Sequence, residues 1–449
     1  MAKLRPDARL YLLHAGLLTL GLAIGGLLFN LAIVALGYAE LRVALPLLGE
    51  RSFLGLINSL PALLAALTSL PIWWLVSRSG PLPALLLGSA LQAVFLLIIA
   101  FADSWQILLL AALITGPAAV LYQVSAAPLI MQQSSTADRD LLFSLNAGIN
   151  IGVAGLGSLL GGLLPGLAAA LLGTAPQSPQ AYRVVFGVAG LTALVSLLPL
   201  LALYRSRSEG RKTKDESGVE DPLKLGTTQR ESSVIHALPL TAHRPPSLVR
   251  RLPSLIPLLP FALPPLIISC GAALFIPYLN LYFQQRYGVP DAWLGAIFAA
   301  IGVTTGLATL GAPIISRRFG RMPSVVLTQA LAVPCLLLLG FTPLLGLAVG
   351  SAVLRGALMN MASPLYDAEA MERAPADLRP TLIGLINGAF SVGYTFAPAI
   401  SAEIQLRAGF TPIFVITAIC YASAAALTYA LFVKKSALAH THLSESAEL

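Results

Sequence analysis

The chain has 449 residues, of which 57% are hydrophobic and only 11% are charged, and its formal net charge is +8. Soluble globular domains carry roughly 25% charged residues, so this composition excludes a soluble protein and predicts one that lies in a lipid bilayer. In a membrane protein, a positive net charge indicates cytoplasmic loops rather than a nucleic-acid partner.

The first apolar stretch begins at Leu10 and continues to about Leu36. The hydrophobic region of a signal peptide spans about 7–15 residues, so this stretch is long enough to predict a retained transmembrane helix instead. Eleven further segments also hold the roughly 20 apolar residues that cross a bilayer. The twelve predicted spans cover residues 10–37, 52–75, 82–102, 105–130, 141–172, 182–204, 255–284, 291–315, 323–340, 343–367, 380–405 and 410–433.

The basic residues predict the orientation of these spans. With the N-terminus in the cytoplasm, most of the 28 Lys and Arg residues fall on the cytoplasmic side, as the positive-inside rule requires. An even number of spans then places both termini in the cytoplasm, and we expect the inner membrane of a bacterium. The residues predicted on the opposite side are Arg42, Arg51, Arg183, Arg286 and Arg407.

A polar segment at 205–254 separates the first six predicted spans from the last six. It contains the run RSRSEGRKTKDESGVEDP and few apolar residues, so it is predicted to be a flexible cytoplasmic linker. The predicted organisation is therefore an N-terminal six-helix bundle over 1–204, the linker, a C-terminal six-helix bundle over 255–433, and a cytoplasmic tail over 434–449.

The two halves repeat each other at a nearly constant offset of 240 residues. Six spans per half mean that both halves begin on the same side, which is typical of parallel repeats related by an axis along the membrane normal. The matched pairs include Leu54 with Leu294, Gly55 with Gly295, Arg78 with Arg318, Gly80 with Gly320 and Pro83 with Pro323.

The repeated arginine loops carry a resemblance to the major facilitator superfamily of secondary transporters, whose signature G-x-x-x-D-R-x-G-R-R lies between helices two and three. The copy here, PIWWLVSRSGPLP, keeps Arg78 and Gly80, and the second copy, SRRFGRM, keeps Arg318, Gly320 and Arg321. The resemblance covers the chain outside 205–254 and the tail, and implies an all-α fold of twelve helices in two pseudo-symmetric bundles.

The resemblance also implies that these loops act in gating, with Arg317 as a further loop residue. Neither copy has the family's acidic residue, because Ser77 and Arg317 occupy that position. We therefore expect the loop arginines to meet helix C-termini or carboxylates of neighbouring segments. The stretch GSLLGG at 157–162 is similar to an antiporter element of the family, and close helix packing explains its glycines equally well.

Arg355 is the clearest candidate for substrate binding. It lies near the centre of the span 343–367, where a buried arginine costs about 2.5–3.5 kcal/mol on insertion scales. We expect it to meet an anionic substrate or to couple charge, with a fixed structural partner as the alternative. Other polar residues in the predicted spans are binding candidates or interhelical hydrogen bonds: Asn30, Gln123, Asn150, Tyr278, Asn280 and Asn360.

The positions of the carboxylates do not predict a proton-binding site at the centre of any span. No Asp or Glu lies in the middle of a predicted span, whereas proton-coupled carriers usually embed one. Asp367 and Glu403, near helix ends, are candidates for a coupling proton only if those ends line a wet cavity.

No cofactor or metal site is predicted. Cys270, Cys335 and Cys420 lie in separate apolar runs as small hydrophobic residues, and no CxxC, HExxH, P-loop or GxSxG motif occurs. The tail pair His440 and His442 is predicted to be solvated, with metal binding as the weaker alternative.

The predicted function is secondary active transport of a small solute by alternating access, by a monomer that is not an enzyme. The favoured hypothesis is efflux of small amphipathic or anionic molecules. Facilitative or proton-coupled uptake of a polar metabolite is the alternative. A polytopic membrane enzyme acting on lipid is more remote, because the loops offer only the cluster DRD at 138–140 and no histidine.

Overall fold

The computed structural model describes residues 5–45, 49–134, 138–216, 256–375 and 378–434. Within these ranges twelve helices are long and apolar enough to cross a membrane. Six of them lie before Glu216, where the described part of the first half ends, and six follow Ile256. The predicted twelve-helix fold in two halves is confirmed.

The first half contains one helix for each of its first five spans and a divided sixth. The sixth span is made of α6 and α7, which are interrupted at Ser196. Its helices are α1 (Pro6–Ala35), α2 (Phe53–Ser79), α3 (Pro81–Phe101), α4 (Trp105–Gln133), α5 (Arg139–Leu172), α6 (Pro179–Val195) and α7 (Leu197–Glu216).

The second half begins with a broken helix. A short 3-10 turn, η2 (Ile256–Leu258), leads into α9 (Leu259–Phe275), and a second turn, η3 (Ile276–Tyr278), separates α9 from α10 (Leu279–Tyr287). Pro277 lies in that turn and cannot donate a backbone hydrogen bond, so the break is expected there. The remaining helices are α11 (Asp291–Phe319), α12 (Arg321–Phe341), α13 (Leu345–Arg373), α14 (Arg379–Ala408) and α15 (Thr411–Thr428), which continues as the π-helix η4 (Tyr429–Lys434).

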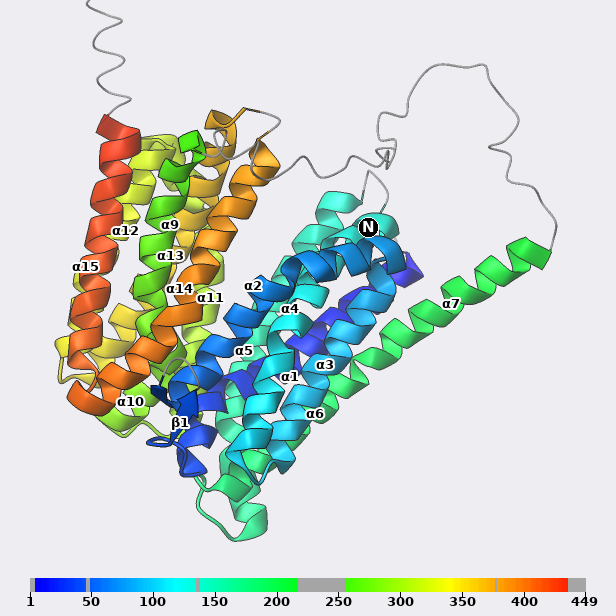
Figure 1. The fold of residues 1–449 in the computed structure, drawn as a ribbon, viewed down its shortest axis with the longest axis horizontal. Helices are drawn as coiled ribbons and strands as arrows, with labels where there is room; N and C mark the ends of the chain where they lie inside the picture. The colour runs from blue at the N-terminus through cyan, green and yellow to red at the C-terminus, as the bar shows by residue number, and fades with distance from the viewer. Residues whose placement is uncertain (1–4, 46–48, 135–137, 217–255, 376–377, 435–449) are drawn as a thin grey trace, which may run out of the picture.

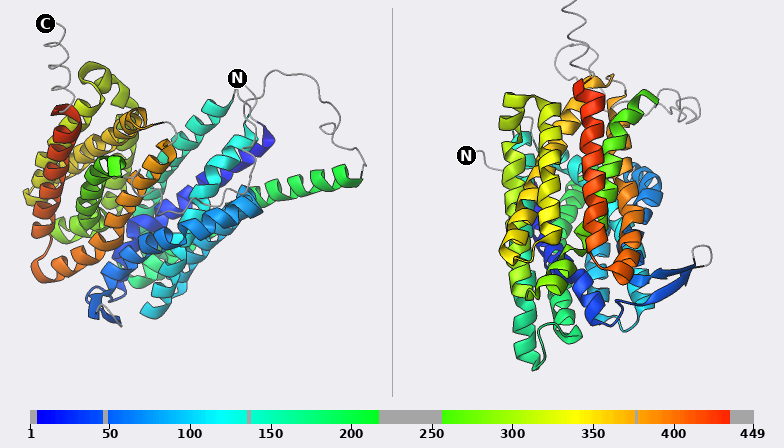
Figure 2. Two further views of the ribbon diagram at one scale, coloured as in Figure 1. Left: turned by 45° about the horizontal axis from the view of Figure 1, so that its top comes forward. Right: turned by 90° about the vertical axis from the view of Figure 1, so that its left-hand side faces the viewer.

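The two halves form separate bundles that lean together at one end (Figure 1). The end where α7 finishes and α9 begins is called the linker end, and the opposite end, which carries β1, is called the hairpin end. Figure 2 shows the same arrangement from two further directions, with the blue hairpin projecting beside the two bundles.

The long connection between α1 and α2 forms a β-hairpin, which the sequence did not predict. Strands β1 (Arg42–Leu45) and β2 (Gly49–Ser52) pair antiparallel, with Arg42 opposite Ser52. Ser52 then caps α2, because its side chain accepts a hydrogen bond from the Gly55 N–H at 3.4 Å. The hairpin is therefore fixed directly to the start of a spanning helix.

Pro199 has no N–H to donate to the carbonyl of Val195, so the sixth span is interrupted beside Ser196. A buried histidine binds the chain at this interruption. His14 of α1 is fully buried, and its Nδ1 lies 2.7 Å from the carbonyl oxygen of Ser196. A carbonyl only accepts, so Nδ1 carries the proton and Nε2 accepts from the Ser89 hydroxyl at 3.2 Å. His14 thus ties α1 to α3 and to the junction between α6 and α7.

The predicted boundary at residue 204 needs an adjustment. Helix α7 continues through 205–216, so the first twelve residues of the predicted linker are helical. Arg, Lys and Glu are good helix formers, and they extend a helix that the membrane span has already nucleated. The rest of that linker, 217–254, lies outside the described residues, as do the tail from 435 and its pair His440 and His442.

Candidate functional site: a charged cavity beneath a closed interface

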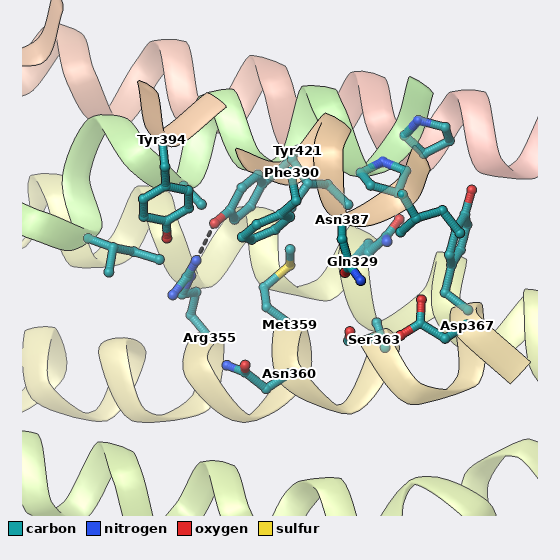
Figure 3. A pocket seen from close by; sticks show the side chains of 18 residues that line it. Gln329, Arg355, Met359, Asn360, Ser363, Asp367, Asn387, Phe390, Tyr394 and Tyr421 are labelled. Atoms are coloured by element: carbon teal, nitrogen blue, oxygen red, sulfur yellow. Dashed lines mark hydrogen bonds between the residues drawn. The ribbon is translucent and has the colours of Figure 1, made fainter. Parts of the chain in front are cut away.

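A cavity of about 370 Å³ lies in the second half, along one face of α13. Arg355, Met359, Ser363 and Asp367 are spaced four residues apart, so their side chains lie in a row on the helix. Figure 3 shows Arg355 at one end of this row and Asp367 at the other. The facing walls include Pro264, Ile268, Gln329, Asn387, Phe390, Tyr394 and Tyr421 from α9, α12, α14 and α15.

Arg355 lies at the deep end of the cavity with only neutral partners. It is 8% exposed, and its Nη2 donates a short hydrogen bond to the Tyr421 hydroxyl. Its guanidinium carbon lies 4.7 Å from the ring centre of Phe275 and 5.4 Å from that of Tyr421. Among the described residues no carboxylate forms an ion pair with Arg355, and its buried Nε has no acceptor.

These neutral contacts offset a burial cost of the same order, but none of them neutralises the charge. A cation–π contact contributes about 0.5–2 kcal/mol and a hydrogen bond about 0.5–1.5 kcal/mol. Burying an arginine at mid-membrane costs about 2.5–3.5 kcal/mol even on the mildest scale. The arginine is held rigidly in its aromatic surroundings, and its positive charge is left for a ligand to neutralise.

Asp367 lies at the other end of the row, towards the linker end. Twelve residues separate it from Arg355, which is about 18 Å along a helix. Asp367 is half-buried, and the structure records no hydrogen bond or ion pair for it within the described ranges. The cavity therefore has a cation at its deep end and a carboxylate near its mouth.

The first half holds a matching cavity of about 670 Å³ that carries no charge. Its lining includes the predicted binding residues Gln123 and Asn150, and Thr115, which is the repeat counterpart of Arg355. The Thr19 hydroxyl donates to Asn150 Oδ1 at 2.7 Å. Further polar side chains of the lining are Gln92 and Tyr122. The two cavities thus combine neutral polar groups in one half with a cation in the other.

The other predicted binding residues fall into two places. Asn360 lines the cavity of Arg355, and its amide donates to the Gly356 carbonyl at 2.9 Å. Asn30, Tyr278 and Asn280 instead bridge the two halves near the hairpin end. Asn30 donates to the carbonyl of Pro277, and Asn280 donates to the carbonyl of Leu27 at 2.7 Å. The Tyr278 hydroxyl lies 3.4 Å from the carbonyl of Leu54 in the first half and 2.8 Å from that of Pro398 in its own half.

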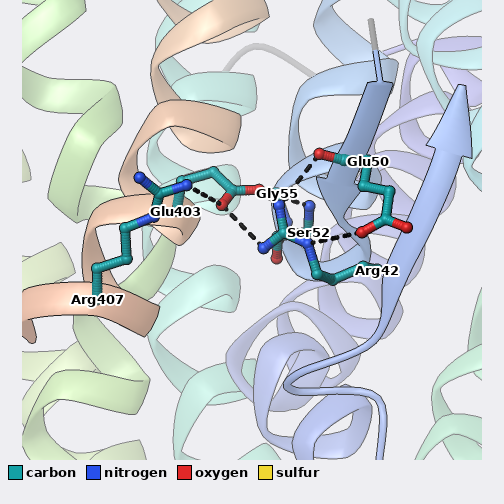
Figure 4. A network of polar contacts seen from close by, with 6 residues as sticks. All are labelled: Arg42, Glu50, Ser52, Gly55, Glu403 and Arg407. Atoms are coloured by element: carbon teal, nitrogen blue, oxygen red, sulfur yellow. Dashed lines mark hydrogen bonds and ion pairs between the residues drawn. The ribbon is translucent and has the colours of Figure 1, made fainter.

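A network at the base of the hairpin also joins the halves (Figure 4). Both terminal nitrogens of Arg42 donate to the carboxylate of Glu403 on α14, at 3.1 and 3.3 Å. The same carboxylate accepts from the Ser52 N–H at 2.8 Å. The side chain of Glu403 is only 15% exposed, so the hairpin covers it while bridging to the second half.

Glycines allow the helix backbones of the two halves to touch at the hairpin end. A Cβ atom on Gly162 of α5 would lie 2.4 Å from the carbonyl oxygen of Asp291 and 2.8 Å from the Cα of Gly295 on α11. A Cβ on Gly55 of α2 would lie 2.7 Å from the Cα of Ala399 on α14. These close approaches join the two halves at the hairpin end.

Between the described residues of the two halves, no such bridge is recorded at the linker end. Every hydrogen bond or ion pair that the structure records between described residues of the two halves lies at the hairpin end. The packing of α5 on α11 extends from Gly162 to Ile151, which contacts Gly306 about halfway along the helices. Beyond that point the bundles separate in Figure 1. The described structure is therefore closed at the hairpin end and parted at the linker end.

The two arginine loops adopt the same turn at the linker end. Gly80 and Gly320 have φ angles of +84° and +86°, a region that favours glycine. Arg78 lies over the ring of Trp74, at 3.9 Å from its centre. Arg318 lies 5.5 Å from the ring centre of Phe319, and Arg317 is exposed.

In the second loop a neighbouring helix supplies the missing acid. Arg321 forms ion pairs with Glu372 and, at 3.7 Å, with Glu369, both on α13. Glu369 also accepts from Arg373 at 2.8 Å. The loop is thus tied by charge to the helix that carries Arg355 and Asp367.

We expect Arg42→Ala to loosen the closed end. Partly exposed ion pairs contribute about 1 kcal/mol or less, so closure should weaken by up to roughly fivefold. The measurement is the rate at which a water-soluble maleimide labels Ala402→Cys, which is buried behind the hairpin. Glu403→Gln should raise the labelling rate by the same factor, and the double variant should raise it no further.

Arg183→Ala is the matched control, because Arg183 pairs with Asp103 at 2.8 Å within the first half. If Arg183→Ala raised the labelling rate as much as Arg42→Ala, the Arg42–Glu403 pair would have no special part in closure.

Two helical bundles, a cavity in each and one closed end define a membrane transporter that can open its halves alternately. The family model of the Major Facilitator Superfamily matches residues 18–398 and, in a second match, residues 267–447, and the chain belongs to this superfamily. The predicted family and the predicted class, a transmembrane transporter, are confirmed.

Solved structures share this fold at low sequence identity. An inward-facing, unoccupied bacterial homolog of the human lysosomal transporter Spinster has a TM-score of 0.66 and 15% identity, over 97% of this chain and 96% of that one. A D-xylose-proton symporter has a TM-score of 0.66 and 15% identity, over 94% and 97% of the two chains.

Among curated proteins, a Deinococcus radiodurans protein named "Putative sugar efflux transporter" is 29% identical over 168 residues. The match covers 35% of this chain and 42% of the relative's length.

Proposed function

We propose that this transporter exports a small, sugar-sized polar solute through alternating opening of its two halves. The observation that carries the proposal is the pair of cavities, one in each half, beneath a single closed interface. Sugar-sized solutes suit cavities of a few hundred Å³ lined by amides, hydroxyls and aromatic rings. The name of the Deinococcus relative supports both the sugar class and the outward direction.

The proposed roles divide the polar residues between binding and gating. Arg355, Asn360, Gln123 and Asn150 line the two cavities and bind the solute. Asn30, Tyr278 and Asn280 close the hairpin end, together with the Arg42–Glu403 pair. The loop residues Arg78, Gly80, Arg317, Arg318, Gly320 and Arg321 gate the linker end.

The proposed orientation places the linker end in the cytoplasm of a bacterium. Basic residues concentrate towards the termini, the linker and the arginine loops, as the positive-inside rule requires. The protein would then lie in the inner membrane as a monomer with both termini in the cytoplasm. In that orientation the structure corresponds to an inward-facing state, ready to take up solute for export.

We propose that protons drive the export and that Asp367 carries them. It is the carboxylate of the charged cavity, it is half-buried, and it has no recorded partner within the described ranges. Protonation of such a group changes the charge of the cavity without breaking a structural contact. Glu403, the other candidate, is held by Arg42 and Ser52, so its charge serves closure.

Flux in liposomes tests the transport proposal. Purified protein should move radiolabelled sugars or sugar derivatives, and a pH gradient should drive their accumulation. Asp367→Asn should abolish that accumulation but retain solute exchange at equal pH, because the binding groups remain. Asp103→Asn, at the hairpin end, serves as control. If the folded protein exchanged no class of solute, the transport proposal would be rejected. If Asp367→Asn accumulated solute as the unaltered protein does, the role of Asp367 would be rejected.

A further inference from the structure

The charge of the cavity in the second half identifies the chemical class of the solute. We infer that the transported solute is an acidic sugar derivative, a polyol bearing a carboxylate or phosphate group, whose anion neutralises Arg355. The inference rests on the proposed function, and it adds the charge that the solute must carry.

The first step is that Arg355 needs an anion. Its side chain is more than nine-tenths buried, and it lines the cavity rather than the lipid-facing surface. Its recorded partners are a neutral hydroxyl and two aromatic rings, on Tyr421 and Phe275. Among the described residues of the cavity lining, Asp367 is the one carboxylate, and it lies about 18 Å away along the helix. The charge is therefore uncompensated within the described protein.

The second step is that the arginine lies too deep in the bundle to reach lipid headgroups or the surface at the hairpin end. It lies ten residues into α13, counted from the hairpin end, and that end is closed. Figure 3 shows its guanidinium directed towards Tyr421 and Tyr394 within the bundle. A solute that enters from the linker end would meet Arg355 last, at the deepest point of the cavity.

The third step concerns the remainder of the solute. Arginine recognises carboxylate and phosphate through paired N–H groups, so one end of the solute should be such an anion. The polar side chains that line the cavity of the first half are all neutral, and they include Gln92, Thr115, Tyr122, Gln123 and Asn150. Amide and hydroxyl groups of this kind match the hydroxyls of a sugar. The asymmetry between the two halves thus fits a molecule that is acidic at one end and hydroxylated at the other.

Binding of three probes to the purified full-length protein tests the inference. The probes share a hexose ring: D-glucose is neutral, D-glucuronate carries a carboxylate, and D-glucose 6-phosphate carries a phosphate. We expect at least one of the two acids to bind at least tenfold more tightly than glucose, by calorimetry and by thermal stabilisation. The acid that binds more tightly identifies which anion the site takes.

Variants of Arg355 connect the preference to this side chain. Arg355→Gln should weaken binding of the preferred acid at least tenfold and leave glucose binding within about twofold. Arg355→Lys keeps the charge and should retain part of the preference. Arg286→Gln, which removes an exposed arginine at the hairpin end, should change neither affinity. The comparison of probes on the unaltered protein does not depend on the folding of any variant.

The outcomes separate this inference from the proposed function. The acidic class of solute would be overturned if glucose bound as tightly as both acids, or if Arg355→Gln weakened the binding of glucose and of the acid equally. Either result would still be compatible with a sugar transporter. A further outcome is that the protein binds none of the three probes and yet exchanges an unrelated class of solute in liposomes. That result would overturn both the acidic-sugar inference and the sugar part of the proposed function. Absence of exchange for every solute class would count against transport itself.

Discussion

Gly162→Val should abolish net transport while leaving the protein folded. Gly162 of α5 touches the backbone of α11 at the closed hairpin end, where even a Cβ would lie 2.4 Å from the Asp291 carbonyl oxygen. Overpacking of this kind costs about 1–3 kcal/mol, and more where backbone meets backbone. Because 1.4 kcal/mol is a factor of ten, the population of the closed state should fall by about fivefold to a hundredfold or more. In the proposed orientation the transporter would remain open to the outside.

The matched control is Gly166→Val, one turn further along α5, where a Cβ would meet nothing within 4 Å. The unfolding temperature and the labelling of Ala402→Cys should be measured for both variants. Gly162→Val should label rapidly and unfold cooperatively, and Gly166→Val should behave like the unaltered protein. Normal transport by Gly162→Val would show that closure of α5 on α11 is not needed.

Gly393→Val should have the largest effect on stability. Gly393 of α14 packs on α9 within the second half, where a Cβ would lie 2.1 Å from the Ser269 hydroxyl oxygen and 2.6 Å from the Cys270 nitrogen. This contact lies inside one bundle, so no movement between the halves relieves it. We expect a loss of about 3 kcal/mol or more, and a low yield of folded protein.

The control for Gly393 is Gly388→Val on the same helix, where a Cβ has no neighbour within 4 Å. Thermal unfolding in detergent and elution in size-exclusion chromatography measure both variants. A Gly393→Val protein as stable as Gly388→Val would mean that α9 and α14 can separate freely. The contrast between Gly162 and Gly393 distinguishes contacts that break during transport from contacts that persist.

Hydropathy predicts the spans because each depends on local composition. The fifth span, predicted over 141–172, is observed over Leu141–Leu172. The contact made at Ser196 could not be predicted in this way, because its partner His14 lies 182 residues earlier. The β-hairpin escaped prediction too: its strands are short, and its position depends on Arg42 meeting Glu403, 361 residues later.

Part of the candidate site could also be predicted from the sequence. A charge at the centre of an apolar span is costly, so Arg355 stands out without any structure. Its partners Tyr421 and Phe275 could not be identified, because they come from other helices and look like ordinary apolar-span residues. At an offset of 241 residues, one more than in the loops, Gly152 corresponds to Gly393. A Cβ on Gly152 would meet nothing within 4 Å, so a shared sequence position does not ensure shared packing.

The buried pair at the interface shows the same limit. The Tyr182 hydroxyl of the first half donates to the Asp291 carboxylate of the second at 3.0 Å. Asp291 lies at a predicted span boundary, where a carboxylate is unremarkable in the sequence. Only the approach of the two halves makes it a buried contact, 5% exposed.

The central claim is that the halves open alternately at their two ends. Spin-label distances test it in a cysteine-free background, with Arg51→Cys and Arg407→Cys at the hairpin end, and Met131→Cys and Met371→Cys at the linker end. Changing pH or adding a transported solute should lengthen one distance and shorten the other in the same fraction of molecules. Distances that stay fixed, or that lengthen together at both ends, would contradict alternating access between these two bundles.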